Sequence, residues 1–368
     1  MIYFDNAATT YPKPKSVINS VNDCLENYCG NPGRGSHLLA RKSATSVYET
    51  REKIARLLNV DTPENVVFTY NATYALNLAI KTLLTPNCHV ITSDIEHNSV
   101  IRPLEKLKIT RRISYSLFNS DGDVENNIRA LISKNTTCII STLASNVNGK
   151  TIDFEVLSSI SIKYGLKLIV DASQYIGYNQ IDLTKTPCDV LCAPAHKSLY
   201  GIQGCGFAVF KESTVKESFI EGGSGTESKS IYMPSFLPEG YEAGTLSTPA
   251  IVALGAGVDF INSALIYRKK NGIFSISEAI KNQLSKLDNI ILYPSFGSIL
   301  AFNHNGYTSE ELSSFLDSQG ICVRGGFHCA PSAHRKLGTL DYGCVRISLS
   351  CFNNENDVVG FFDALNKA

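Results

Sequence analysis

Polar side chains follow five short apolar runs in this chain of 368 residues. The runs, at 66–69, 89–93, 137–142, 167–170 and 189–193, have the length of buried strands and alternate with segments of helical spacing. The residues that follow them include Thr73, His97, Asn146, Asp171, Gln174, His196 and Lys197. Ligands of open α/β sheets bind beyond the carboxyl ends of the strands, so we expect these side chains to share one rim.

This set of side chains matches the needs of pyridoxal phosphate. The turn through Asn71 and Thr73 opens a helix, whose unpaired N–H groups suit a phosphate. A partly desolvated Lys197 would have a lowered pKa, and its neutral amine could form a Schiff base with an aldehyde. Asp171 could keep a pyridine nitrogen protonated. The alternative is that Lys197 is a solvated loop lysine and Asp171 a helix cap.

Other phosphate-binding motifs fit less well. No Gly-x-Gly-x-x-Gly occurs, so we do not expect a dinucleotide. The segment from Ala144 to Thr151 resembles a P-loop only weakly, because alanine replaces the first glycine, and it explains none of the other strand ends.

Composition excludes several classes of protein. The 34 basic and 34 acidic residues cancel, which leaves no electrostatic footprint for nucleic acid or an anionic membrane. No apolar run approaches the roughly 18 residues that span a bilayer, and Asp5 follows the first apolar residues where a signal peptide would continue. The 11 cysteines include no Cys-x-x-Cys pair, which favours reduced thiols in the cytoplasm. We expect no metal site, since the closest pair, Cys188 and Cys192, has poor spacing for zinc.

The strand–helix alternation predicts an α/β fold with a mostly parallel sheet. The pattern changes after about Gly257, where a helix-like stretch at 250–270 leads into a smaller α+β region. We therefore expect a large domain at 15–255 and a small domain made of 1–14 and 256–368. The glycine-rich run 221–226 is the best candidate for a mobile loop.

Ten motifs in order give the chain a recognisable pattern. They are YFDNAAT (3–9), GRGSH (33–37), NATYALN (71–77), EHNS (96–99), SNVNG (145–149), DASQ (171–174), AHK (195–197), YEAGT (241–245), RGGFHCAP (324–331) and VRISL (345–349). On these motifs the sequence resembles the class V aminotransferase superfamily of fold-type I pyridoxal phosphate enzymes over nearly its whole length. Within it, the sequence is most similar to the cysteine desulfurase and selenocysteine lyase branch.

The resemblance implies a role for each matching position. Lys197 would form the Schiff base, Asp171 would pair with the pyridine nitrogen, His97 would stack on the ring, and Gln174 would bond its phenolic oxygen. Thr73 and His196 would hold the phosphate, with Thr245 reaching it from the second subunit of a homodimer. Arg346 and Asn146 would bind the substrate carboxylate, and His37 and Arg324 would lie on the substrate side. Structural roles without a function in catalysis remain open for three residues: Arg346 could be a surface arginine, His37 a helix start and Asn146 a turn residue.

Cys329 separates a desulfurase from a plain aminotransferase. A thiolate there could take sulfur from L-cysteine as a persulfide and release L-alanine, with Arg324 and His328 supplying a positive environment. The short segment around Cys329 resembles desulfurases that pass sulfur to an acceptor protein. Alternatives are a selenocysteine lyase acting on L-selenocysteine, another class V aminotransferase or β-lyase, or a binding protein without catalysis.

The sequence departs from the family pattern three positions before Lys197. Pro194 stands where a serine or threonine hydroxyl usually holds the phosphate, and proline offers neither a hydroxyl nor an N–H. We therefore expect weaker retention of the cofactor than in related enzymes.

Overall fold

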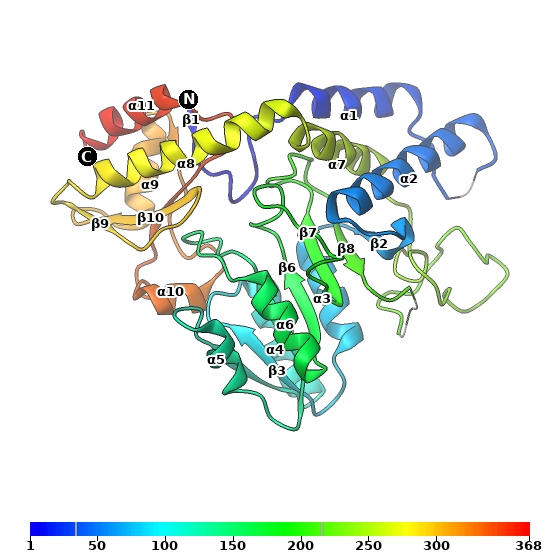
Figure 1. Cartoon of the computed structure of the whole chain (residues 1–368). Coiled ribbons are helices and arrows are strands. Elements are labelled where there is room, and N and C mark those ends of the chain that lie inside the picture. The colour runs from blue at the N-terminus through cyan, green and yellow to red at the C-terminus, as the bar shows by residue number, and fades with distance from the viewer. Residues whose placement is uncertain (34, 214, 216) are drawn as a thin grey trace.

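The computed structural model describes residues 1–33, 35–213, 215 and 217–368. Arg34, which belongs to one of the family motifs, lies outside the described residues. A seven-stranded sheet forms the centre of the larger part of the molecule (Figure 1). Its strands, in spatial order, are β2 (Val66–Thr69), β8 (Gly206–Phe210), β7 (Val190–Pro194), β6 (Lys167–Asp171), β5 (Thr136–Thr142), β3 (His89–Ser93) and β4 (Ser114–Phe118). Only β8 runs against the other strands, so the predicted α/β fold with a mostly parallel sheet is confirmed.

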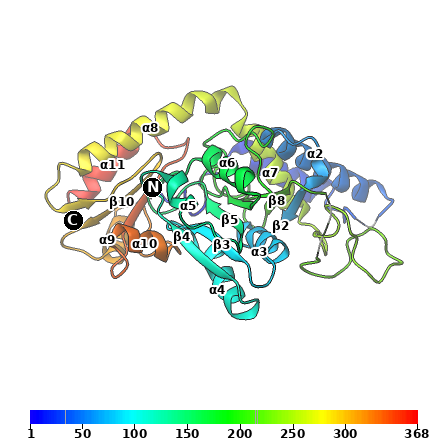
Figure 2. The same cartoon turned by 60° about the horizontal axis from the view of Figure 1, so that its bottom comes forward.

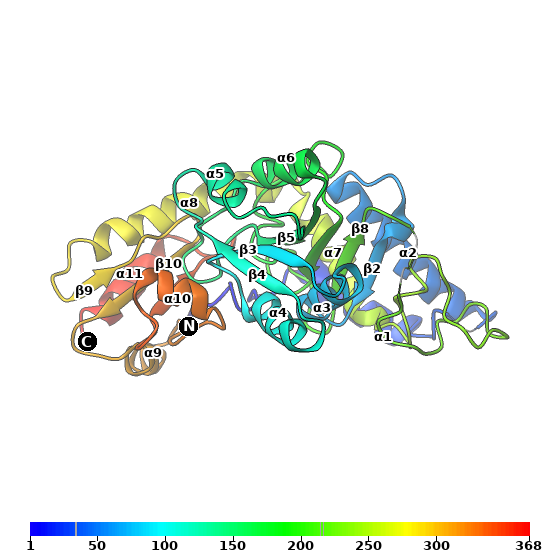
Figure 3. The ribbon, with the colours of Figure 1, turned by 90° about the horizontal axis from the view of Figure 1, so that it is seen from below.

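Helices cover both faces of this sheet. Figure 3 shows α3 (Ala72–Leu83) and α4 (Asn98–Thr110) on one side and α5 (Val124–Arg129) and α6 (Phe154–Tyr164) on the other. Alternate strand residues enter two separate apolar cores: Ile169 packs with the α3 and α4 side, and Leu168 with the opposite side. Buried residues on both faces explain why the strands read as continuous apolar runs rather than as alternating patterns.

The other helices of this part come from residues 15–65 and 248–261. They are α1 (Lys15–Asn27), α2 (Leu38–Leu58), the short 3₁₀ helix η1 (Pro63–Asn65) and α7 (Thr248–Ile261). Helix α7 packs against both α1 and α2. The helix expected over 250–270 is in fact two helices, because α7 ends at Ile261 and α8 (Ala264–Leu284) begins after a break at Asn262 and Ser263.

The C-terminal part has a sheet of its own. An antiparallel sheet in the order β12 (Val345–Ser348), β10 (Ile299–His304) and β9 (Ile290–Leu292) is accompanied by α8, α9 (Ser309–Ser318), α10 (Pro331–Leu337) and α11 (Glu355–Leu365). Strand β1 (Ile2–Tyr3) pairs in parallel with β11 (Ile321–Cys322), which brings the N-terminus to this part of the molecule (Figures 1 and 2). The division into a large domain at 15–255 and a small domain made of 1–14 and 256–368 remains a prediction.

Among the described residues, no helix is both long and apolar enough to span a membrane.

Candidate active site

A cavity of about 190 Å³ lies beyond the carboxyl ends of the central parallel strands. We call it the rim cavity. Its walls include Asn71, Thr73, His97, Ser99, Asn146, Asp171, Gln174, Pro194, His196 and Lys197. All five predicted strand ends therefore contribute to one cavity. Four of them follow the neighbouring strands β7, β6, β5 and β3, and the fifth follows β2, which lies on the other side of β8.

Lys197 and Asp171 face this cavity from neighbouring strands. Burial lowers the pKa of Lys197 to about 8, and the negative charge of Asp171 partly opposes that shift. Asp171 is 4% exposed, and its Oδ1 accepts a hydrogen bond from the Ser173 N–H at 2.9 Å. A lysine with this pKa has an appreciable neutral fraction near neutral pH, which a nucleophilic amine needs.

The N-terminus of α3 provides an anion seat at one end of the cavity. Asn71 caps the helix by accepting a hydrogen bond from the Tyr74 N–H at 2.9 Å, and the Thr73 hydroxyl lies 2.7 Å from that of Ser99. Gly206 lets this turn lie against β8, since a Cβ there would come within 2.6 Å of the Asn71 carbonyl carbon. The first N–H groups of a helix and its positive end favour a phosphate.

His196 adds an unsatisfied polar atom to this seat. Its Nδ1 is buried and has no hydrogen-bond partner among the described residues. Burial, and then the charges of Lys197 and Lys13, lowers the pKa of His196 to about 4, so the ring is neutral. Buried polar atoms are nearly always satisfied, so this nitrogen indicates a missing ligand oxygen or N–H. Together with Lys197 and Asp171, the seat fits pyridoxal phosphate; Pro194 lines the cavity but has no group to offer the phosphate.

His97 forms another wall of the cavity at the start of α4. Its Nδ1 accepts a hydrogen bond from the Ser99 N–H at 3.0 Å, which leaves the proton of the neutral ring on Nε2. Burial, and then the charge of Lys197, lowers the pKa of His97 to about 4. The ring is therefore held in one orientation and stays uncharged at neutral pH.

Arg346 is not a surface arginine. It is 1% exposed, and its Nη2 lies 2.6 Å from Asp5 Oδ1 while its Nη1 donates to the Asn146 carbonyl at 2.8 Å. The buried Nε has no partner among the described residues. Asn146, the residue that the guanidinium contacts, lines the rim cavity and is itself buried. The Nε–H of Arg346 is thus unpaired, in a guanidinium that contacts the cavity residue Asn146.

The loop that carries Cys329 is hydrogen-bonded to the cavity wall. The Asn98 N–H, next to His97, donates to the Cys329 carbonyl at 2.8 Å, and the Asn146 side chain donates to the His328 carbonyl at 2.7 Å. Cys329 is an exposed free thiol, and both it and His328 have left-handed backbones, with φ of 54° and 50°. The loop that carries this exposed thiol is thus hydrogen-bonded to two walls of the cavity.

The expected positive environment around Cys329 is only partly present. Burial, followed by the charge of Arg346, lowers the pKa of His328 to about 2, so His328 carries no charge at neutral pH and that expectation is wrong. Arg324 is exposed, and its backbone pairs with that of Arg346 through two hydrogen bonds of 3.2 and 2.8 Å. Of the two expected cations, only Arg324 remains.

Of three other predicted residues, the structure places one in the cavity and two outside it. Gln174 lines the rim cavity and donates to the Ala7 carbonyl at 2.8 Å. His37 is exposed and caps α2 by accepting a hydrogen bond from the Ala40 N–H at 3.3 Å. This is the helix start that was given above as its alternative role. Thr245 is exposed beside Asn31 and lines a different hollow. Neither His37 nor Thr245 reaches the cavity of its own chain.

Three contributors were not singled out from the sequence. Asp5 pairs with Arg346, Ser99 joins Thr73 to His97, and Glu96 is a fully buried carboxyl directly before His97. All three lie in the family motifs, so those motifs could have identified them. Their residue types alone suggested no role.

The fold and the site together define a fold-type I enzyme that uses pyridoxal phosphate. The chain belongs to the class-V aminotransferase family, whose model matches residues 2–361.

Several known proteins resemble the chain over nearly its whole length. A "probable cysteine desulfurase" of Methanothermobacter thermautotrophicus is 29% identical, with 97% of this chain and 92% of that protein aligned. A cysteine desulfurase of Salmonella agona is 27% identical over 97% and 91%. The apo structure of a cysteine desulfurase from Thermococcus onnurineus NA1 superposes with a TM-score of 0.92 at 26% identity, covering 100% of this chain and 94% of that one.

Proposed function

We propose that the protein is a cysteine desulfurase that converts L-cysteine to L-alanine and takes the sulfur onto Cys329 as a persulfide. The observation that carries the proposal is the exposed Cys329 thiol on a loop hydrogen-bonded to the walls of the rim cavity. The names of the relatives, at 26–29% identity, support the same activity.

Several side chains of the rim cavity have a role in this reaction. The N-terminus of α3, Thr73 and His196 would hold the phosphate of pyridoxal phosphate, and Asp171 would lie at the ring nitrogen. When bound, the cofactor supplies an electron sink for the substrate's α-carbon. Lys197 Nζ, whose pKa is about 8, accepts the α-proton once it is free as an amine.

Substrate binding depends on Arg346 and Asn146. The free Nε of Arg346 can donate to the substrate carboxylate, and burial of the guanidinium would strengthen this ion pair. Cys329 Sγ then attacks the substrate's sulfur: a sulfur–sulfur bond forms and the bond between sulfur and the β-carbon breaks. The electron pair left on carbon is protonated, and L-alanine leaves. A thiol reductant or an acceptor protein later removes the sulfur from Cys329.

The test is the variant Cys329→Ser, with Cys29→Ser as the matched control because Cys29 is the other exposed thiol. With L-cysteine and a reductant, Cys329→Ser should lose sulfide and alanine production while keeping the visible absorbance of the bound cofactor. Cys29→Ser should keep full activity. Full activity in Cys329→Ser would refute the role of this thiol. Turnover of L-selenocysteine alone by this variant would favour a selenocysteine lyase.

We also propose that the enzyme is a cytoplasmic homodimer in which Thr245 and His37 serve the partner's cavity. Both residues are exposed and neither lines the cavity of its own chain, which supports a role across an interface. All eleven cysteines are free thiols, as a reducing compartment requires. Sedimentation analysis should give a dimer, and Thr245→Ala should lose cofactor; a monomer that retains full activity would contradict this arrangement.

A further inference from the structure

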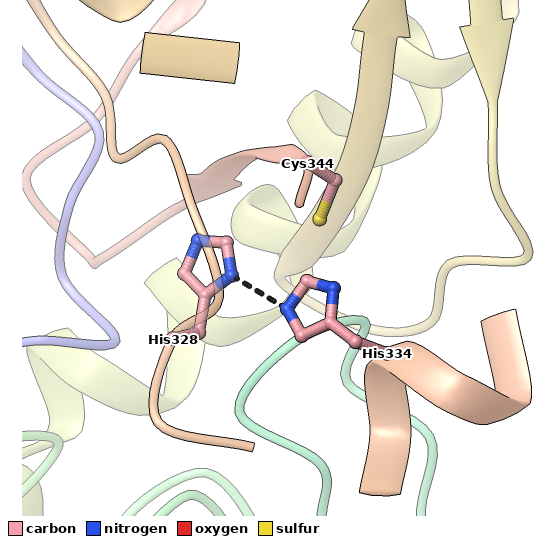
Figure 4. A group of neighbouring side chains, drawn as sticks. All are labelled: His328, His334 and Cys344. Carbon is pink, nitrogen blue, oxygen red and sulfur yellow. Dashed lines mark hydrogen bonds between the residues drawn. The ribbon is translucent and has the colours of Figure 1, made fainter. Parts of the chain in front are cut away.

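A second cluster of chemically able side chains lies behind the Cys329 loop. Figure 4 shows His328, His334 and Cys344 pointing toward one another. The three come from different segments: His328 from the loop after β11, His334 from α10, and Cys344 from the residue before β12. None of them lines the rim cavity.

The spacing of their ligand atoms suits a small metal ion. One ligand atom from each residue lies within 4.8 Å of the other two, and His328 Nδ1 is 3.2 Å from His334 Nε2. Two imidazole nitrogens bound tetrahedrally to Zn²⁺ at 2.0–2.1 Å are about 3.3 Å apart, so the histidine pair is already at the required separation. A modest inward shift of the thiol would complete three ligands of a tetrahedral site.

The outward nitrogens of both histidines are held by further groups. His328 Nε2 lies 3.2 Å from the Arg324 carbonyl, and His334 Nδ1 lies 2.7 Å from the Thr339 hydroxyl. Metal-binding histidines nearly always have such outer partners, which orient the ring and fix which nitrogen faces the ion. The two rings are also parallel, with an interplanar angle of 6°.

The site is buried and held in place by the backbone. The exposed fractions are 5% for His328 and 0% for both His334 and Cys344, and no hydrogen bond to the Cys344 thiol is found among the described residues. The Cys344 N–H donates to the Gly326 carbonyl at 3.1 Å, which fixes the thiol beside the loop. A buried cysteine with two buried histidines is a donor set that selects borderline and soft metals.

We propose that His328, His334 and Cys344 form a binding site for a thiophilic divalent cation such as Zn²⁺, with its fourth position open to water. Binding replaces the hydrogen shared by the two histidines with the ion. The ring proton of His334 moves to Nδ1, facing Thr339, and the Cys344 thiol releases one proton to solvent. The ion would brace the segment next to Cys329 and the strand that carries Arg346. The proposal is independent of the desulfurase activity, because occupancy is measured without turnover.

The experiment is a titration of the chelator-treated holoenzyme with Zn²⁺ in competition with a chromophoric chelator. It uses a Cys329→Ser background, so that the exposed thiol contributes nothing. We expect one ion per chain with a dissociation constant below about 1 μM. Cys344→Ser should weaken binding more than about 100-fold, because even an outer partner is worth about 10- to 100-fold. Cys322→Ser, in the neighbouring strand β11, should leave the affinity unchanged.

A spectroscopic readout covers the case in which a variant misfolds. Co²⁺ added to the same protein should give a thiolate-to-metal band that is absent in Cys344→Ser and present in Cys322→Ser. Less than one ion per two chains, no such band, or equal affinity in the Cys344→Ser protein would each overturn the proposal. In that event the three side chains form only a neutral hydrogen-bonded pair packed on a thiol.

Discussion

Glu96 is a buried acid whose effect on stability can be worked out in detail. It is 0% exposed; its Oε1 accepts from the Ser93 hydroxyl and, at 2.8 Å, from the Thr142 N–H, while Oε2 has no partner among the described residues. Burial raises its pKa from 4.5 to about 8, and the charge of Asp171 adds to the rise, while the hydrogen bonds from Ser93 and Thr142 oppose it. The protonated form is therefore the one that the fold prefers.

The sign of the pH dependence follows from that preference. Above pH 4.5 the unfolded chain loses the Glu96 proton, whereas the folded chain keeps it until about pH 8. Stability is therefore lost as the pH rises through this window, by about 1.4 kcal/mol per pH unit. Between about pH 6 and pH 8 the loss amounts to about 2 kcal/mol, since the folded group is half ionised at the upper end. Glu96→Gln keeps the shape and cannot ionise, so it should escape this loss.

The assay is urea unfolding of the wild-type and Glu96→Gln holoenzymes at both pH values and one protein concentration. The free energy of unfolding of the variant, relative to wild type, should rise by about 2 kcal/mol from pH 6 to pH 8. The exposed Glu26→Gln serves as the control and should show no such change. An equal difference at the two pH values would refute the argument that Glu96 is protonated in the fold.

Three further perturbations test other parts of the site. Pro194→Ser should lower the dissociation constant of pyridoxal phosphate by about tenfold, worth one hydrogen bond to a charged group, in a fluorescence titration; no change would count against the phosphate seat. Asp5→Asn should lower the free energy of unfolding by about 3 kcal/mol, because it leaves buried Arg346 uncompensated; a loss below about 0.5 kcal/mol would contradict that pairing. Gly325→Ala should impair sulfide release, because its Cβ would lie 2.3 Å from the Ser309 carbonyl and displace the Cys329 loop; unchanged release would show that the loop adapts.

Much of the fold could be predicted from short-range patterns. The five strands predicted for the large sheet agree with the observed ones within one residue, because buried strands carry their apolar pattern locally. The meeting of His97, Asp171 and Lys197 could be predicted as well, because the carboxyl ends of parallel strands share one edge. The break between α7 and α8 was not predicted, because Asn262 and Ser263 are only weak helix-termination signals within a helical pattern.

Some properties of the site were decided by tertiary structure alone. Arg346 is a buried partner of Asp5, 341 residues away in the sequence, rather than a surface cation. His328 is neutral because of the burial around it. Neither property can be predicted from the residues next to it in the sequence, because burial and long-range pairing depend on the path of the whole chain.

The sequence by itself predicted the class of cofactor chemistry, through residue types at strand ends together with the family motifs. It could not reveal which groups are charged, nor that His328, His334 and Cys344 converge, because their separations in the chain match no compact metal motif. The carboxyl ends of parallel strands lie at one edge of the sheet, so a local strand pattern is enough to predict that the side chains after them meet. Charge states and convergent side chains arise only when distant segments pack and exclude water.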